Sequence, residues 1–250
     1  MYKGKKVSIV MSTYNEKDSI RECIENFNAT GNVDEIIIVD NNAAVGTVDE
    51  VRKTNAKLVH ESQQGYGYGF RKGLESATGD LLVMCEPDGT FLPSDLPKFL
   101  VYSEEMDVVV GSRTCSSMIL DVANMGLFLK YGNYFVAKIV EFLFMSSAPH
   151  LSDCGCTYRL LTRDAYEKLH PYFRIGKNSF GLEVTLLALS SKMSIVEIPI
   201  HYNKRIGESA VTGSFFKSFK LGIWMIGMSA YYFLESVFKR KKTISSKDRS

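Results

Sequence analysis

The sequence lacks the patterns that most often assign a function at first sight. Its four histidines are scattered, its five cysteines include no CxxC pair, and no GxxxxGK[ST] phosphate-binding loop is present. The formal net charge of +2 is too small to indicate a nucleic-acid-binding surface. No internal repeat and no low-complexity segment is visible. These absences argue against a zinc centre of cysteines and histidines, a P-loop nucleotidase, a repeat protein and a nucleic-acid partner.

The cysteines and the first residues bear on the cell compartment. An odd number of cysteines, several of them inside apolar runs, is typical of a reduced protein and not of a disulfide framework. The chain opens with Lys3, Lys5 and Lys6 and enters a strand pattern without an extended apolar signal segment. We therefore expect the main domain to face the cytoplasm.

An alternation of strand and helix patterns occupies the first 111 residues, and a shorter one follows residue 157. The strand-like runs are Val7–Met11, Glu35–Val39, Leu58–His60, Asp80–Cys85, Asp107–Val110, Tyr158–Leu161 and Ile195–Ile200. The helical segments are Asp18–Phe27, Phe70–Ala77, Ser94–Ser103, Arg163–Leu169 and Phe180–Ser190. Such units predict an α/β fold with a mostly parallel central sheet flanked by helices, and a ligand crevice at the carboxyl ends of its strands.

Polar side chains follow four of the predicted strands and would meet in that crevice. In chain order they are Thr13, Tyr14, Glu16, Asp40, Asn41, Glu86, Asp88, Thr90 and Arg113. Glu86 and Asp88 are two residues apart on one turn, so both carboxylates can approach Mg²⁺ or Mn²⁺ while substrate phosphates supply the other ligands. A cation held there neutralises the charge that builds on a departing diphosphate.

The run Gly65-Tyr66-Gly67-Tyr68-Gly69 does not indicate a dinucleotide site. It follows the third predicted strand instead of the first, and its spacing is not GxGxxG. We expect the glycines, Gly67 among them, to let the backbone turn tightly beside a bound donor, with flexible packing as the alternative reason for them.

Residues 118–149 have the pattern of an amphipathic helix. One face carries Phe128, Phe135, Ile139, Phe142 and Leu143, and charged side chains cluster on the opposite side. This pattern predicts either a helix packed on the domain or a helix that lies at a membrane surface.

A second apolar segment, Phe215–Phe238, precedes a basic tail. Its longest uncharged part, Leu221–Leu234, has 14 residues. As a helix this part is about 21 Å long, short of a ~30 Å hydrocarbon core, which favours an interfacial or re-entrant helix over a span. Residues 239–250 hold six basic side chains and one acidic one. We expect peripheral or monotopic attachment to an anionic membrane surface through residues 214–242.

The order of these motifs resembles a known family. The series is Val7-Ser8-Ile9-Val10, Thr13-Tyr14-Asn15-Glu16, Val39-Asp40-Asn41, Ala77-Thr78-Gly79-Asp80, Glu86-Pro87-Asp88, Gly111-Ser112-Arg113, Ser152-Asp153, Tyr158-Arg159-Leu160, Glu197-Ile198-Pro199-Ile200 and Arg205-Ile206-Gly207-Glu208-Ser209. It resembles the family 2 glycosyltransferases with the GT-A fold, and is most similar to the dolichol-phosphate mannose synthase group with its polyprenyl-phosphate glucosyltransferases. The resemblance runs from about residue 7 to residue 213. It implies a GT-A catalytic domain over 1–213, with acceptor- or membrane-proximal helices at 118–149, and a C-terminal apolar helix with a basic tail over 214–250.

The resemblance also implies roles for individual residues. Those of the nucleotide-sugar site are Thr13, Tyr14, Glu16, Asp40, Asn41, Gly67, Glu86, Asp88, Lys204 and Arg205. Those of the metal site are Glu86, Asp88 and Thr90. Those that bind the acceptor are Arg113, Lys130 and Arg159, and those with a catalytic part are Asp88, Asp153, Arg113 and Lys130. Lys204 or Arg205 corresponds to the basic residue that closes over the donor diphosphate.

Three positions depart from the family pattern. Glu86 stands where an aspartate is usual, which bears on the metal geometry, and Asn41 replaces an aspartate, which bears on base preference. Ala210 stands where a lysine is usual, so the diphosphate clamp lacks one charge unless Lys204 and Arg205 together replace it.

The implied activity is the inverting transfer of a hexose from a nucleotide-diphosphate sugar to a polyprenyl phosphate at the cytoplasmic membrane face. A phosphate monoester is already ionised at neutral pH, since its second pKa is near 6, so Arg113 and Lys130 that position it matter more than a histidine base. A glycan or other hydroxyl acceptor is the first alternative, and would need a carboxylate base such as Asp153. A non-catalytic GT-A module that binds a nucleotide or a membrane protein is the second. The oligomeric state stays open, a homo-oligomer included.

Overall fold

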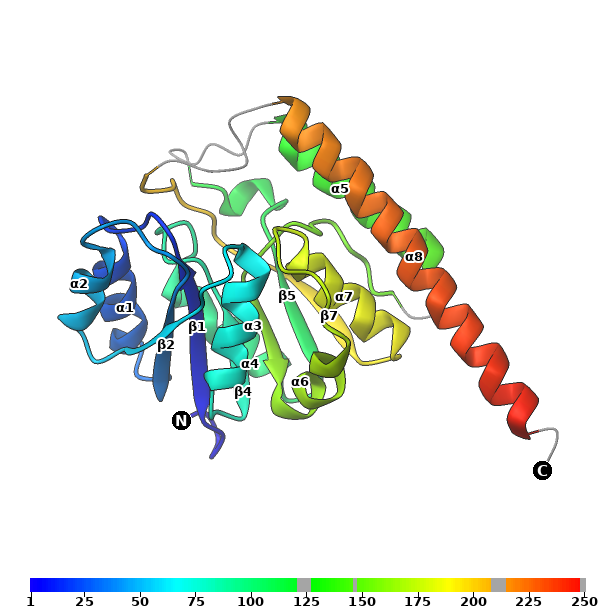
Figure 1. The fold of residues 1–250 in the computed structure, drawn as a ribbon, viewed down its shortest axis with the longest axis horizontal. Coiled ribbons are helices and arrows are strands. Elements are labelled where there is room, and N and C mark those ends of the chain that lie inside the picture. Colours follow the sequence, from blue (N-terminus) through cyan, green and yellow to red (C-terminus); the bar gives the residue numbers. More distant parts are fainter. Residues whose placement is uncertain (121–126, 146–147, 208–214, 248–250) are drawn as a thin grey trace.

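The computed structural model describes residues 1–120, 127–145, 148–207 and 215–247, and the side chains of these except 127–129, 215–218 and 239–247. Its centre is a sheet of seven strands in the order β3-β2-β1-β4-β6-β5-β7 (Figure 1). The strands are β1 (Val7–Thr13), β2 (Glu35–Asp40), β3 (Lys57–His60), β4 (Leu81–Met84), β5 (Val108–Ser112), β6 (Arg159–Thr162) and β7 (Ile195–Pro199). The α/β fold with a mostly parallel sheet is confirmed, because only β6 runs antiparallel to its neighbours β4 and β5.

Two hydrophobic cores lie on the two faces of the sheet. Along β1, Val10 points into one core, while Ile9 and Met11 point into the other, as the two-residue period of a strand requires. Helices α1 (Ile20–Ala29), α2 (Thr47–Arg52) and α4 (Leu96–Tyr102) cover one face. Helices α3 (Tyr66–Ser76), α6 (Arg163–Leu169) and α7 (Phe180–Ser190) cover the other. Single 3₁₀ turns lie at Pro93–Asp95, Ser116–Met118 and His170–Tyr172.

Helices α4 and α5 are among those that differ from their predicted bounds. The predicted helix at 94–103 begins instead with a 3₁₀ turn, and α4 itself starts at Leu96. The predicted single helix over 118–149 is wrong in extent, because α5 covers only Leu127–Leu143. Helix α2 was not predicted, since its six residues carry too few apolar side chains for a helical period to show.

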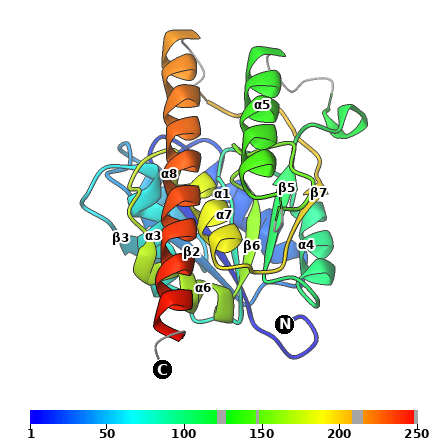
Figure 2. The ribbon, with the colours of Figure 1, turned by 90° about the vertical axis from the view of Figure 1, so that its right-hand side faces the viewer.

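Helices α5 and α8 (Phe215–Lys247) lie side by side on one flank of the domain (Figure 2). The ring of Phe144, just after α5, packs edge-on against Phe233 of α8, with 5.6 Å between the ring centres. Helix α8 buries Met225, Met228 and Tyr232 on the same side. Helix α8 is therefore docked on the rest of the domain through this stretch.

Helix α5 packs with a different face from the predicted one. Its buried residues are Val136, Ala137 and Val140, whereas Phe135 and Phe142 are 61% and 73% exposed. The helix therefore has a packed apolar face and an exposed apolar face, and the predicted face is divided between them, because Phe135 and Phe142 are exposed whereas Leu143 packs against the core. Phe128 lies outside the described side chains.

Tyr232 ties α8 to α7, and Glu235 ties α8 to the loop before α7. The Tyr232 hydroxyl donates to the buried carboxylate of Glu183, and the Arg174 guanidinium lies 3.0 Å from the Glu235 carboxylate. Among the described residues, one helical segment, Phe219–Phe238, is long and apolar enough to cross a membrane, and 28% of it is buried in the structure. The predicted domain boundary at residues 213 and 214 and the departure at Ala210 lie outside the described residues.

Candidate active site

The acidic residues Glu16, Glu86 and Asp88 of the predicted site meet beyond the carboxyl ends of β1 and β4, which pair in parallel. Because β6 is antiparallel, the residues that precede it enter the sheet at the same edge. The segment after β7 crosses this edge as well, since the amide of Asn203 donates to the Thr90 carbonyl at 2.9 Å and that of Ile206 to the Asp88 carbonyl at 2.9 Å. Three distant parts of the chain thus meet at one edge of the sheet, where the topology of an α/β sheet predicts a ligand crevice.

A cluster of three carboxylates surrounds the Arg205 guanidinium in this crevice. Nitrogen Nη1 of Arg205 lies 3.1 Å from Oδ2 of Asp88 and 3.6 Å from Oε2 of Glu86, and Nη2 lies 3.5 Å from Oε1 of Glu16. Of the two predicted clamp residues, the structure brings Arg205 to the acidic pair. Lys204 is exposed and is not among the ion pairs of the described residues.

The turn after β4 is shaped by Asp88. The side chain is fully buried, and its Oδ1 accepts from the Thr90 amide (3.0 Å) and hydroxyl (2.6 Å). Its other oxygen, Oδ2, accepts no hydrogen bond, since the nearby Arg205 nitrogen is not aligned to donate to it. A buried carboxylate oxygen without a donor is costly in a ligand-free protein and is suited to a cation. Thr90 supports Asp88 here, and its own predicted metal contact stays a prediction.

Glu86 lies beside Asp88 with one oxygen bound and the other facing Arg205. Oxygen Oε1 accepts from the Thr157 hydroxyl at 2.6 Å, and Thr157 accepts from the Tyr66 hydroxyl at 2.5 Å. Burial and the neighbouring Asp88 charge raise the pKa of Glu86 to about 7, against the lowering effects of Thr157 and Arg205. Thr157 and Tyr66 escaped the sequence reasoning, since they lie 91 positions apart and belong to no shared spacing pattern.

The chemistry of this donor set fits a divalent cation with help from a substrate. Among the described residues, no group of three or more histidine, cysteine, aspartate or glutamate side chains is arranged to hold a metal ion. A cation at Asp88 and Glu86 therefore needs further oxygen ligands, and the phosphates of a nucleotide-sugar are of the right kind.

The residues predicted to hold the nucleotide differ in how open they are. Tyr14 is 53% exposed at the mouth of the crevice. Glu16 turns back on its own loop, where Oε2 accepts from the Thr13 hydroxyl at 3.0 Å and from the Tyr14 amide at 2.8 Å. The Asp40 carboxylate accepts a hydrogen bond from the Ala43 amide at 2.8 Å, and its side chain is partly exposed to solvent.

Asn41 and Gly67 are buried and have packing roles. The Asn41 amide group donates to the Gln63 carbonyl at 2.7 Å and accepts from the Gly65 amide at 2.8 Å, which fixes the loop before α3. A Cβ on Gly67 would lie 2.5 Å from the Ile175 carbonyl oxygen, so only glycine allows this approach. The glycine run therefore serves close packing, and the predicted donor contacts of Asn41 and Gly67 stay predictions.

Arg113 and Asp153 form a two-pronged ion pair on the other side of the crevice. Nε of Arg113 donates to Oδ2 at 2.7 Å and Nη2 to Oδ1 at 2.9 Å, with Asp153 almost fully buried. Burial alone would raise the pKa of Asp153, but the adjacent Arg113 charge and its hydrogen bonds hold that pKa below its usual value. Asp153 is thus ionised, and both of its oxygens accept hydrogen bonds from Arg113. The Arg113 guanidinium in turn lies over the Tyr202 ring, 5.4 Å from its centre.

Lys130 and Arg159 lie at very different depths. The Lys130 ammonium, on α5, donates to the Ser116 hydroxyl at 3.0 Å near the surface. Arg159 is fully buried, and its guanidinium donates to the carbonyls of Gly181 and Cys156. Arg159 thus joins β6 to α7, and its predicted acceptor contact stays a prediction.

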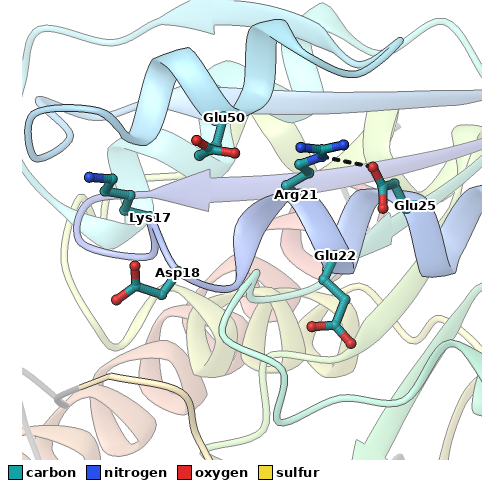
Figure 3. A pocket seen from close by; sticks show the side chains of 6 residues that line it. All are labelled: Lys17, Asp18, Arg21, Glu22, Glu25 and Glu50. Atoms are coloured by element: carbon teal, nitrogen blue, oxygen red, sulfur yellow. Dashed lines mark hydrogen bonds and ion pairs between the residues drawn. The ribbon is translucent and has the colours of Figure 1, made fainter.

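An open hollow lies away from this crevice, between α1 and α2. Its lining consists of six charged side chains: Lys17, Asp18, Arg21, Glu22, Glu25 and Glu50 (Figure 3). None of the predicted site residues lines it. Arg21 and Glu25 pair across one helical turn at 2.9 Å, as exposed charges on a helix often do.

Comparisons with known proteins bear on the family of the chain. The chain matches the model of glycosyl transferase family 2 over residues 8–170. It is 29% identical over 210 residues to the low-salt glycan biosynthesis hexosyltransferase Agl6 of Haloferax volcanii. This match covers 81% of this chain and 49% of Agl6, so the chain spans about half of the length of Agl6. It is 27% identical over 206 residues to the dolichyl-phosphate hexose transferase of the same organism (81% of this chain, 85% of that protein). It is 24% identical over 239 residues to the undecaprenyl-phosphate mannosyltransferase of Micrococcus luteus (90% and 95%).

Solved structures support the fold. Glucosyl-3-phosphoglycerate synthase from Mycobacterium tuberculosis, in complex with Mn²⁺, uridine diphosphate and glucosyl-3-phosphoglycerate, superposes with a TM-score of 0.69 at 14% identity, over 93% of this chain and 80% of that chain. At this identity the likeness shows the fold alone. The GT-A architecture expected from the sequence is confirmed.

Proposed function

Because the chain belongs to glycosyl transferase family 2, we propose that it transfers a hexose, with inversion, from a nucleotide-diphosphate sugar to a polyprenyl phosphate at the cytoplasmic face of a membrane. The observation that carries this proposal is the buried Asp88 carboxylate. Its Oδ2 accepts no hydrogen bond and lies beside Glu86 in the crevice. The relatives named as dolichyl-phosphate and undecaprenyl-phosphate transferases support the class of acceptor.

Asp88 and Glu86 would hold Mg²⁺ or Mn²⁺ through Oδ2 and Oε2, the two oxygens that face Arg205. When bound, such a cation neutralises negative charge on the departing diphosphate. Thr90 keeps the Asp88 carboxylate in place with two hydrogen bonds. The solved neighbours whose titles record Mn²⁺ or Mg²⁺ together with uridine diphosphate support the choice of cation.

Arg205 is the clamp residue for the donor in this proposal. Its guanidinium already lies among the carboxylates of Glu16, Glu86 and Asp88, and it is 30% exposed, so it can turn toward a diphosphate. A guanidinium binds phosphate oxygens in two-pronged fashion, which a lysine cannot do. Tyr14 and Asp40 border the same end of the crevice and would hold the nucleoside.

Arg113 and Lys130 would position the acceptor. Arg113 is held by Asp153, and 14% of its side chain is exposed to solvent. Asp153 itself is a poor general base, because Arg113 binds both of its oxygens and lowers its pKa. A phosphate acceptor is ionised without a base, so this arrangement favours a phosphate over a hydroxyl acceptor.

The flank formed by α5 and α8 would attach the enzyme to the membrane. Large apolar side chains are exposed there: Tyr131, Phe135, Phe142, Met145, Phe219, Ile223, Trp224, Tyr231, Leu234 and Phe238. Apolar surface on a helix pair, followed in sequence by Lys239-Arg240-Lys241-Lys242, is suited to an anionic leaflet. Since α8 also packs on the domain through Met228 and Tyr232, we favour a helix lying along the interface over one that crosses it.

The test is transfer of labelled hexose into an extractable lipid. The purified chain is incubated with Mn²⁺, a polyprenyl phosphate in detergent, and labelled UDP- or GDP-hexose, and label is counted in the organic phase. We expect Asp88→Asn to lower the rate by about 100-fold or more, because it removes transition-state charge stabilisation worth several kcal/mol. Asp49→Asn, at an exposed position of α2, is the matched control and retains activity. Label in a water-soluble product, or full activity of Asp88→Asn, would refute the proposal.

A further inference from the structure

Three polar side chains from separate parts of the chain form a directed hydrogen-bond series that ends at the metal-site carboxylate. The Tyr66 hydroxyl, Thr157 Oγ1 and Glu86 Oε1 follow one another at 2.5 and 2.6 Å. The Thr157 hydroxyl donates to Glu86 and accepts from the Tyr66 hydroxyl, so each hydroxyl proton in the series has one acceptor. Thr157 is 97% buried, with 3% of its surface exposed, so water does not compete for these bonds.

Tyr66 is held at the start of this series by close packing. It opens α3, and its ring meets the Phe70 ring edge-on at 4.7 Å between centres. Its neighbours Gly65 and Gly67 lie so close to the backbone of residues 175 and 176 that a Cβ on either would come within 2.5 Å of a carbonyl oxygen. The close packing of Gly65 and Gly67 thus fixes the position of Tyr66.

Thr157 is fixed from the opposite side. It lies two residues before β6, whose Arg159 is anchored in the core by carbonyls of the Cys156 and Gly181 backbone. Because β6 is antiparallel to β4, the residue before its start lies next to the turn that follows the end of β4. Thr157 and Glu86 therefore meet although they are 71 positions apart in the chain.

These bonds select one orientation of the Glu86 carboxylate. A glutamate has one more rotatable side-chain bond than an aspartate, and a free carboxylate in the crevice would populate several rotamers. With Oε1 bound to Thr157, Oε2 is the oxygen that faces Arg205 at 3.6 Å and the buried Asp88.

We propose that Thr157, oriented by Tyr66, is a positioning residue that fixes the Glu86 carboxylate to bind the cation of the donor complex. The inference rests on the proposed function, because it assigns a task at the same site. Hydrogen-bond partners of metal-binding carboxylates typically change metal affinity by about 10- to 100-fold when they are removed. Thr157 and Tyr66 touch neither donor nor acceptor in this assignment, and act through Glu86.

The experiment measures Mn²⁺ binding to the full chain by the electron paramagnetic resonance signal of free Mn²⁺, with UDP and, in parallel, with GDP. Thr157→Val keeps the shape and removes the hydroxyl, and we expect it to weaken Mn²⁺ binding by about 10-fold. Thr157→Ser restores the hydroxyl and is expected to bind within about 2-fold of wild type. Tyr66→Phe should weaken binding in the same direction by a smaller factor. In a Glu86→Gln background, Thr157→Val should have no further effect, since the two changes act through one carboxylate.

The outcomes separate this inference from the function on which it rests. Wild-type affinity in Thr157→Val, or equal weakening in Thr157→Ser and Thr157→Val, would overturn the positioning role alone. Weakening of the same size in the Glu86→Gln background would also overturn it, because the effect would then not pass through Glu86. If the wild-type chain binds no Mn²⁺ with either nucleotide, the proposed function fails together with the inference.

Discussion

The Arg205 guanidinium lies 3.1 Å from the buried Oδ2 of Asp88 without donating a hydrogen bond to it. In the ligand-free chain Arg205 is thus the counter-charge of Asp88 and of its neighbours Glu86 and Glu16. A divalent cation would take over the Asp88 oxygen, and the guanidinium would then be available to the diphosphate that arrives with the cation.

The first prediction separates the two predicted clamp residues. Arg205→Ala should lower kcat/KM for the nucleotide-sugar by about 100-fold, because it removes a charged group that donates hydrogen bonds to the leaving diphosphate. Lys204→Ala, one position away and exposed, should change it by less than about 3-fold. Donor saturation curves for the two variants measure this. A larger loss in Lys204→Ala would assign the clamp to Lys204 instead.

The second prediction concerns the pH dependence of stability at Asp153. Because Arg113 lowers the native pKa of Asp153 below its unfolded value of 3.8, the native state binds fewer protons there than the unfolded state at low pH. The stabilisation is therefore complete above that value and is lost as the pH falls through the native pKa. Asp153→Asn should cost on the order of 3 kcal/mol near neutral pH, since it leaves the Arg113 charge buried and unpaired.

Urea denaturation of wild type and Asp153→Asn between about pH 7 and about pH 3 checks this expectation. The gap in unfolding free energy should stay constant down to about pH 4 and shrink below it. Asp164→Asn, at an exposed position of α6, is the control. A gap that does not change with pH would show that Asp153 stabilises the fold by packing and not by its charge.

The third prediction concerns the acceptor. Lys130→Met should raise KM for the polyprenyl phosphate by about 10-fold, the effect of losing one charge-assisted hydrogen bond, and leave donor binding unchanged. Lys138→Met, on the same helix but paired with Glu141 at 2.8 Å, is the matched control and should leave KM unchanged. Equal effects of the two variants would mean that α5 contributes only a general positive charge.

The fourth prediction tests membrane attachment. Deletion of the whole segment would also remove Met225, Met228 and Tyr232 from the core, so surface substitutions are the sharper probe. Ile223→Ser with Trp224→Ser, both 57% exposed on α8, should weaken sedimentation with anionic vesicles by on the order of 10-fold. Val101→Ser, equally exposed on α4, should leave sedimentation unchanged. Unchanged sedimentation of the α8 variant would refute attachment through this surface.

The strands could be predicted from sequence because each is a short apolar run. The Glu35–Val39 run is one residue shorter than β2, and the other runs match their strands to within two residues at each end. The antiparallel direction of β6 could not be predicted in this way, because a run of apolar residues does not show which strands it pairs with. The start of α3 was placed at Phe70 instead of Tyr66, because glycines weigh against a helix unless tertiary packing requires them.

The site was predictable where it depends on position along a strand, and not where it depends on contacts across the fold. Glu86 and Asp88 follow β4 directly, so the sequence places them at the crevice. The pairing of Arg113 with Asp153 and the series from Tyr66 through Thr157 join residues 40 to 91 positions apart, which no local pattern reveals. The sequence also does not show which face of α5 is buried, because apolar residues lie on both of its sides.

The contact between Glu16 and Arg205 joins positions 189 residues apart. During synthesis, therefore, the ribosome has released most of the chain before this contact can form. Until then the carboxylates of Glu16, Glu86 and Asp88 approach one another without a cationic partner, and their repulsion opposes closure of that edge of the sheet. We therefore expect this contact to form late in folding, because the chain between positions 189 residues apart must close first.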